Sequence, residues 1–164
     1  MRRPEGPAVE DAPLIGSQGV RRHRDFLVKG MLMEGFRVLV VDDETDFLET
    51  IVKRLRKRKV DAVGLTSGVE ALKYLETEHF DVVILDVRMP GPDGIETLKE
   101  MKKKRPLMEV IMLTGHASVE SGMQGMQLGA FDYVIKPADF DELMEKIRQA
   151  RERKSIHEEK LRRS

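Results

Sequence analysis

Residues 80–86 decide the fold of this chain: they read Phe-Asp-Val-Val-Ile-Leu-Asp, a short aliphatic run that ends abruptly in a carboxylate. Runs of this length, rich in β-branched residues, are typical of strands buried on both faces of a parallel sheet. Four further strands are predicted at residues 36–41, 62–65, 109–113 and 131–135. Each of the five runs is followed by a polar or charged segment.

Helical patterns separate these strands. Leu48, Ile51, Val52 and Leu55 fall at i, i+3, i+4 and i+7, which is the apolar stripe of an amphipathic helix. Three other helices are predicted to begin at capping pairs, which are Ser67 with Glu70, Asp93 with Glu96 and Asp139 with Glu142. Segment 118–129 predicts a weaker helix, since it contains three glycines and each costs a helix about 0.5–1 kcal/mol relative to Ala.

Five strands that alternate with five helices predict an α/β fold with helices on both faces of a parallel sheet. Right-handed crossovers favour a doubly wound sheet with the flavodoxin-like strand order 2-1-3-4-5. The domain is predicted to span residues 36–150. Residues 1–35 are rich in Pro and Gly and predict a disordered leader or tag with room for one short helix, and residues 151–164 predict a charged helical tail or a severed linker.

Composition excludes several classes of function. The chain of 164 residues has no cysteine, so disulfides, thiolate metal sites and cysteine nucleophiles are absent. Its 29 basic and 29 acidic residues argue against nucleic-acid binding through a basic surface. No apolar run approaches the roughly 20 residues of a membrane span, and no signal peptide is recognisable. These features fit a cytoplasmic protein.

Reactive side chains stand at the ends of four predicted strands, where the sites of doubly wound folds lie. They are Asp42 and Asp43, Asp86, Thr114, and Lys136. Clustered carboxylates repel one another, and a divalent cation such as Mg²⁺, which prefers oxygen ligands, relieves that repulsion. A carboxylate can also act as a nucleophile on phosphorus, with an ammonium and a hydroxyl to bind the phosphoryl oxygens. The set therefore predicts phosphoryl transfer assisted by Mg²⁺.

Four motifs resemble those of the receiver domains of bacterial two-component response regulators. They are Val-Val-Asp-Asp-Glu at 40–44, Val-Ile-Leu-Asp-Val-Arg-Met-Pro-Gly at 83–91, Leu-Thr-Gly-His-Ala at 113–117 and Tyr-Val-Ile-Lys-Pro at 133–137. They occur in the family's order, one at each of four strand ends, and the resemblance covers about residues 36–150. Each motif alone is weak, but the four together are highly specific.

The resemblance implies a role for each site residue. Asp86 is expected to be the phosphoacceptor, and Asp43 and Asp86 are expected to bind Mg²⁺ directly with the main-chain carbonyl of Arg88. Asp42 is expected to act mostly through waters. Lys136 and Thr114 are expected to contact the phosphoryl group, with Thr114 as the switch hydroxyl. Tyr133 stands at the position of the switch aromatic, and Pro137 at that of a proline that usually follows a cis bond.

The same resemblance implies a regulatory domain rather than an enzyme, although with intrinsic self-phosphorylation and dephosphorylation chemistry. The expected partner is a sensor histidine kinase or a phosphotransfer protein. Output is expected through the face formed by the fourth helix, fifth strand and fifth helix, with an output domain in a longer chain or a phosphorylation-dependent homodimer as further expectations. The chain itself is expected to bind neither membrane nor nucleic acid.

Alternatives remain open at this stage. A receiver-like scaffold that binds partners without phosphorylation is the main one. A phosphatase with an aspartate nucleophile would need a second acid where Arg88 stands, and a dinucleotide-binding enzyme would need a glycine-rich turn where residues 42–45 stand. Tyr133 could be a packing residue, and the basic run 53–59 either a solvated helix face or part of a kinase-docking surface. Met112, Met123 and Met126 are expected in the core.

Overall fold

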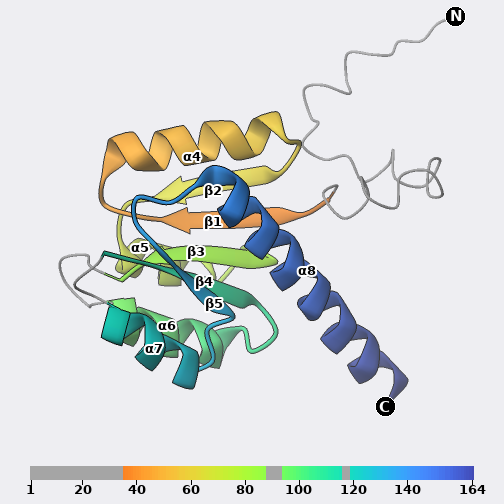
Figure 1. The fold of residues 1–164 in the computed structure, drawn as a ribbon. Coiled ribbons are helices and arrows are strands. Elements are labelled where there is room, and N and C mark those ends of the chain that lie inside the picture. The colour runs from red at the N-terminus through yellow and green to blue at the C-terminus, as the bar shows by residue number, and fades with distance from the viewer. Residues whose placement is uncertain (1–34, 88–93, 116–118) are drawn as a thin grey trace, which may run out of the picture.

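The computed structural model describes residues 35–87, 94–115 and 119–164, which form one parallel sheet with helices on both faces (Figure 1). The strands are β1 (Arg37–Val41), β2 (Asp61–Leu65), β3 (Val82–Asp86), β4 (Glu109–Thr114) and β5 (Asp132–Ile135). Their order is β2-β1-β3-β4-β5, and every neighbouring pair is parallel. The predicted fold and strand order are confirmed.

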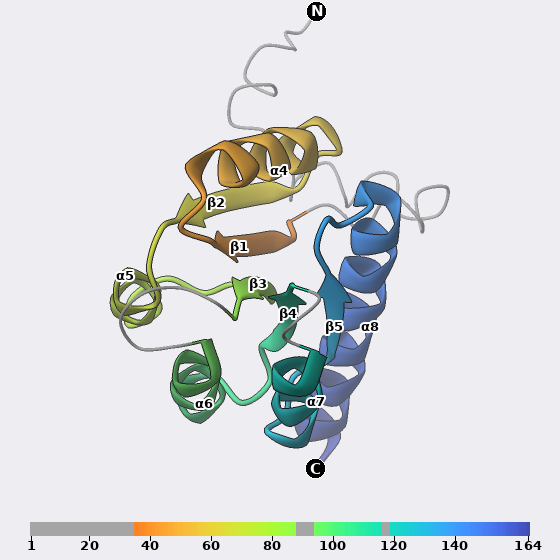
Figure 2. The same cartoon turned by 60° about the vertical axis from the view of Figure 1, so that its left-hand side comes forward.

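Each face of the sheet has its own helices and its own apolar cluster. The helices are α4 (Thr45–Lys57), α5 (Gly68–Tyr74), α6 (Gly94–Lys104), α7 (Val119–Gln127) and α8 (Phe140–Arg163). One cluster joins the sheet to α4 and α8, and the other joins it to α5 and α6. Figure 2 shows these two pairs of helices on opposite sides of the sheet. Alternate residues of β1 supply the two clusters, Val38 and Val40 the first and Leu39 and Val41 the second. The aliphatic strand pattern is thus explained by burial on both faces.

Helix starts follow the predicted capping chemistry where the structure describes them. The Ser67 hydroxyl accepts a hydrogen bond from the Glu70 amide, and the Asp139 carboxylate accepts one from the Glu142 amide. Both interactions satisfy an amide that the first helical turn leaves without a partner. The third predicted cap, Asp93, lies outside the described residues.

Helix α8 continues well beyond the predicted domain boundary at residue 150. It runs without interruption to Arg163, so residues 151–163 are helical and belong to the same element that covers the sheet (Figure 1). Among the described residues, no helix combines the length and the apolar character that crossing a membrane requires.

The expectation that three methionines pack in the core is right only for Met112, which is fully buried. Met123 and Met126 are exposed on α7. Their neighbours Gly122 and Gly125 are buried, and an added Cβ there would meet Tyr133 and Met112 respectively. The glycine face of α7 therefore covers the sheet, and the methionines are left on the outer side.

Candidate functional site

Strand pairing brings the carboxyl ends of four strands to one edge of the sheet. Val41 pairs with Leu85 across β1 and β3, so Asp42 and Asp86, the next residues, lie side by side. Across β4 and β5, Thr114 pairs with Ile135, and the Lys136 amide donates a 2.6 Å hydrogen bond to the Thr114 carbonyl. The doubly wound order thus gathers these side chains where such folds place their sites.

Three aspartates form a cluster at this edge. Asp42, Asp43 and Asp86 each offer a carboxylate oxygen, and these oxygens lie within 4.8 Å of one another. Asp42 is fully buried and Asp86 is 5% exposed, whereas Asp43 faces solvent. Buried like charges are costly unless a cation compensates them. The all-oxygen donor set, open to solvent at Asp43, fits a hard divalent cation such as Mg²⁺.

The Lys136 ammonium lies among the carboxylates. Its Nζ is 2.8 Å from Asp42 Oδ2, 2.7 Å from Glu44 Oε1 and 3.6 Å from Asp86 Oδ2. Burial lowers the pKa of Lys136, but the hydrogen bonds to Asp42 and Glu44 and the charges of Asp42 and Asp86 outweigh burial and raise it. Lys136 therefore stays charged and partly neutralises the cluster. The Lys136–Pro137 peptide bond is cis, as the resemblance implied.

Thr114 is the unusual residue of the site. It is fully buried at the end of β4, yet its hydroxyl has no hydrogen-bond partner among the residues that the structure describes. Buried hydroxyls without a partner are uncommon and cost free energy, so each one calls for an explanation. Thr114 follows Leu113, the β4 residue that pairs with Asp86. The buried hydroxyl is therefore carried by the strand that pairs with the end of β3.

Tyr133 lies close to Thr114 through a contact with helix α7. A Cβ added at Gly122 would lie 2.8 Å from Cδ2 of the Tyr133 ring and 3.3 Å from the Thr114 methyl carbon. The ring is half-buried and packs against the apolar cluster under α5 and α6. Tyr133 is therefore a packing residue in this conformation. Its ring and the Thr114 methyl group both lie beside Gly122.

Most of the sequence-predicted site residues are brought together. Asp42, Asp43, Asp86 and Lys136 form one cluster, and Thr114 adjoins it on β4. Arg88 lies outside the described residues. Glu44, which bonds Lys136, was not predicted as a site residue. Its only sequence signal was a third acid directly after Asp42 and Asp43.

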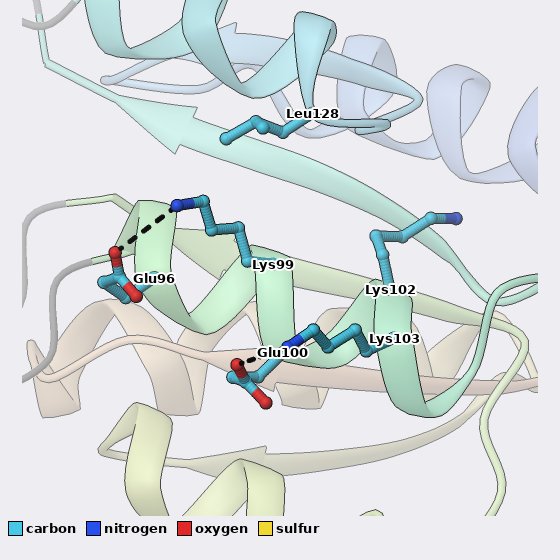
Figure 3. Close-up of a pocket in the computed structure, with 6 residues that line it drawn as sticks. All are labelled: Glu96, Lys99, Glu100, Lys102, Lys103 and Leu128. Atoms are coloured by element: carbon cyan, nitrogen blue, oxygen red, sulfur yellow. Dashed lines mark ion pairs between the residues drawn. The ribbon is translucent and has the colours of Figure 1, made fainter.

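A separate groove lies between α6 and Leu128, the residue that follows α7 (Figure 3). Its lining consists of Glu96, Lys99, Glu100, Lys102, Lys103 and Leu128, none of which is a predicted site residue. Lys99 pairs with Glu96 and Lys103 pairs with Glu100, as Figure 3 shows. Lys102 donates hydrogen bonds to the carbonyls of Pro106 and Met108 instead. The lysines of this groove thus have partners of their own, and the acidic cluster remains the candidate site.

Comparison with known proteins agrees with this geometry. A family model described as the response regulator receiver domain matches residues 38–148. The chain belongs to this family. The matched range contains β2 to β5, nearly all of β1, and the three aspartates of the acidic cluster.

Relatives of this receiver domain include longer regulators. The transcriptional regulatory protein ZraR of Escherichia coli K12 is 38% identical over 120 residues, which cover 73% of this chain and 27% of ZraR. The DNA-binding transcriptional regulator NtrC of the same strain is 34% identical over 113 residues, or 69% of this chain and 24% of NtrC. The chain thus spans about a quarter of the length of these relatives.

A solved receiver domain has the same fold. The crystal structure of a response regulator receiver domain protein from Clostridium thermocellum is 36% identical in sequence and superimposes with a TM-score of 0.71. The match covers 74% of this chain and 98% of that protein. The match thus extends over nearly the whole of that receiver domain protein.

Proposed function

We propose that this receiver domain is a signalling switch that accepts a phosphoryl group on Asp86 from a sensor histidine kinase or a phosphotransfer protein. One observation carries the proposal: the buried Asp86 carboxylate lies beside Asp42 and Asp43, with the Lys136 ammonium 3.6 Å away. A nucleophile, oxygen ligands for a cation and a positive charge are thus present in one small volume. Phosphoryl transfer requires mainly such positioning and charge neutralisation.

In the proposed reaction, an Asp86 carboxylate oxygen attacks the phosphorus of a phosphohistidine. The O–P bond forms, the P–N bond breaks, and the leaving imidazole takes up a proton from solvent. Asp43 and Asp86, together with the main-chain carbonyl of Arg88, would hold Mg²⁺, and Asp42 would act through waters. When bound, this ion supplies charge neutralisation for the carboxylates and the phosphoryl oxygens.

Lys136 and Thr114 would bind the transferred phosphoryl group. The Lys136 ammonium adds positive charge, and the Thr114 hydroxyl donates the hydrogen bond that it lacks among the described residues. Movement of Thr114 would alter the space that it shares with Tyr133 and Gly122. The signal would thereby reach α7 and β5.

The proposed output surface consists of α7, β5 and α8. Three large apolar side chains, Met123, Met126 and Ile135, are exposed on its α7–β5 part. Exposed apolar side chains that lie close together often mark protein-binding surfaces. The partner would be an output domain in a longer chain, a separate protein or a second copy of the domain.

Amide hydrogen exchange tests the switch directly. We expect beryllofluoride with Mg²⁺, a phosphoryl mimic, to change protection in residues 119–136, and we expect no change in Asp86→Asn. Unchanged protection in the wild-type chain would count against the switch. A phosphorylation-independent scaffold, the remaining alternative, predicts that partners bind Asp86→Asn as tightly as the wild-type chain.

A further inference from the structure

Lys136 is shared among three carboxylates, and the nearest of them belongs to Glu44. Its Nζ donates hydrogen bonds of 2.7 Å to Glu44 Oε1 and 2.8 Å to Asp42 Oδ2. Asp86 Oδ2 lies 3.6 Å away, beyond hydrogen-bond distance. In this unphosphorylated conformation the ammonium is therefore directed toward Asp42 and Glu44 rather than toward the proposed phosphoacceptor.

The ammonium also lies near an aromatic ring. Nζ lies 4.6 Å from the centre of the Phe47 ring, on the first turn of α4. A lysine ammonium has three hydrogens to donate. Two are used by Asp42 and Glu44, and the Phe47 ring adds a favourable but weaker interaction with the ammonium.

Glu44 differs from Asp42 in how easily it can give up the contact. The Glu44 side chain is 64% exposed, whereas that of Asp42 is fully buried. The Glu44 amide donates to Asp42 Oδ1, so the backbone of residue 44 is held beside the site while its carboxylate can turn into water. The hydrogen bond from Lys136, followed by the charge of Lys136, lowers the pKa of the Glu44 carboxyl.

We infer that Glu44 is a positioning residue that holds Lys136 away from Asp86 and thereby slows uptake of the phosphoryl group and hastens its loss. The inference rests on the proposed function, in which Lys136 binds the phosphoryl oxygens. The ammonium then leaves Glu44 for the phosphoryl group, and the exposed Glu44 carboxylate becomes hydrated. Because Glu44 competes with the phosphoryl group for the Lys136 ammonium, it favours the unphosphorylated state.

The test uses the full chain with Mg²⁺ and acetyl phosphate and follows phosphorylation by intact mass. Since partly exposed ion pairs are modest in strength, we expect Glu44→Gln to raise the initial rate about three- to tenfold and to lengthen the phosphoryl lifetime by a similar factor. Glu44→Asp keeps the charge but withdraws the carboxylate by one methylene. If the contact with Lys136 matters, Glu44→Asp also accelerates phosphorylation.

Asp46→Asn is the matched control for charge. Asp46 is exposed in the first turn of α4, two residues beyond Glu44, and makes no ion pair with Lys136 in the described part of the chain. We expect the phosphorylation rate of Asp46→Asn to stay within about twofold of the wild-type rate because exposed charges are strongly screened. In the metal-free protein, Glu44→Gln is also expected to increase labelling of Lys136 by an amine-reactive reagent, measured by peptide mass.

The outcomes distinguish the role of Glu44 from the proposed phosphorylation of Asp86. If the wild-type chain is phosphorylated and Glu44→Gln is phosphorylated at the same rate, the role of Glu44 is overturned. The proposed function then remains intact. Equal acceleration by Glu44→Gln and Asp46→Asn would overturn the role of Glu44 too, since general charge would then explain the effect. A wild-type chain that takes up no phosphoryl group under any condition would overturn both.

Discussion

At the scale of single residues, the site is defined by polar groups that folding leaves in unfavourable surroundings. Asp42 and Asp86 are buried carboxylates beside each other, and the Thr114 hydroxyl is buried with no partner among the described residues. Local violations of the rules for stable packing are expected where function requires them. Substitutions of these residues should therefore impair function without lowering the free energy of unfolding to the same extent.

Thr114→Val tests this separation. It replaces the buried hydroxyl by a methyl group of similar size, and a buried polar group without a partner costs about 1–3 kcal/mol. We expect the free energy of unfolding in urea to stay unchanged or to rise by about 1 kcal/mol, while the exchange response of α7 to beryllofluoride is lost. A fall in stability of more than about 1 kcal/mol would mean that the hydroxyl has a structural partner.

Gly122→Ala tests the contact between α7 and Tyr133. The new Cβ would lie 2.8 and 2.9 Å from two Tyr133 ring atoms, so the ring has to move. We expect a net loss of about 1 kcal/mol in unfolding free energy, because strain of about 1–3 kcal/mol exceeds the gain of about 1 kcal/mol in helix propensity. The NMR signals of the Tyr133 ring should shift.

Gly125→Ala is the matched control for this substitution. Its new Cβ would meet the flexible Met112 side chain at 3.3 Å and no ring. We expect it to be neutral or slightly stabilising, with Tyr133 unmoved. Equal effects of the two substitutions would show that Gly122 has no special role beside Tyr133.

At the scale of elements, the continuation of α8 past residue 150 is anchored to the amino ends of the strands. Arg153 donates hydrogen bonds of 2.6 and 2.7 Å to the carboxylate of Glu109, the first residue of β4, which is 2% exposed. Lys154 pairs with Asp81 at 3.1 Å, just before β3. The turn of α8 that carries Arg153 and Lys154 is thus joined to the strands by these ion pairs, whereas Ile156 and Leu161, further along the helix, are exposed.

Removing Arg153 should therefore destabilise the whole domain. Removing one partner of a buried ion pair costs about 3–5 kcal/mol. The cost should be smaller here because Arg153 is half-exposed and Lys102 Nζ lies 4.0 Å from the Glu109 carboxylate. We therefore expect Arg153→Ala to lower the free energy of unfolding by about 1–3 kcal/mol. Adding Glu109→Gln should restore part of it. Urea unfolding measures both.

Arg162→Ala is the control for this pair. Arg162 is well exposed on the same helix, and among the described residues it pairs only with Glu159, also on α8. Surface pairs of this kind are worth about 0–1 kcal/mol. Equal losses for Arg153→Ala and Arg162→Ala would show that the contact with Glu109 does not anchor the helix.

At the scale of the whole molecule, the order of strands and the position of the site were predictable from sequence because each depends on local patterns. Buried strands require aliphatic runs, and strand ends in a doubly wound sheet converge, so Asp42, Asp86, Thr114 and Lys136 could be placed together. The resemblance to receiver domains added their roles.

Other features could not be predicted because they depend on side-chain packing between distant elements. The Glu44–Lys136 contact joins residues 92 positions apart, and the Arg153–Glu109 pair joins residues 44 apart. No local pattern marks either. The exposure of Met123 and Met126 likewise depends on which face of α7 packs on the sheet. The face with the two buried glycines does so, and this is visible only in the folded protein.

The central claim is that Asp86 accepts a phosphoryl group, and intact mass spectrometry tests it most directly. The full chain is incubated with acetyl phosphate in the presence and absence of Mg²⁺, with Asp86→Asn treated in parallel. We predict a mass increase of one phosphoryl group in the wild-type chain with Mg²⁺ and none in the other samples. No increase in the wild-type chain, even with a histidine kinase as donor, or an equal increase in Asp86→Asn, would contradict the claim.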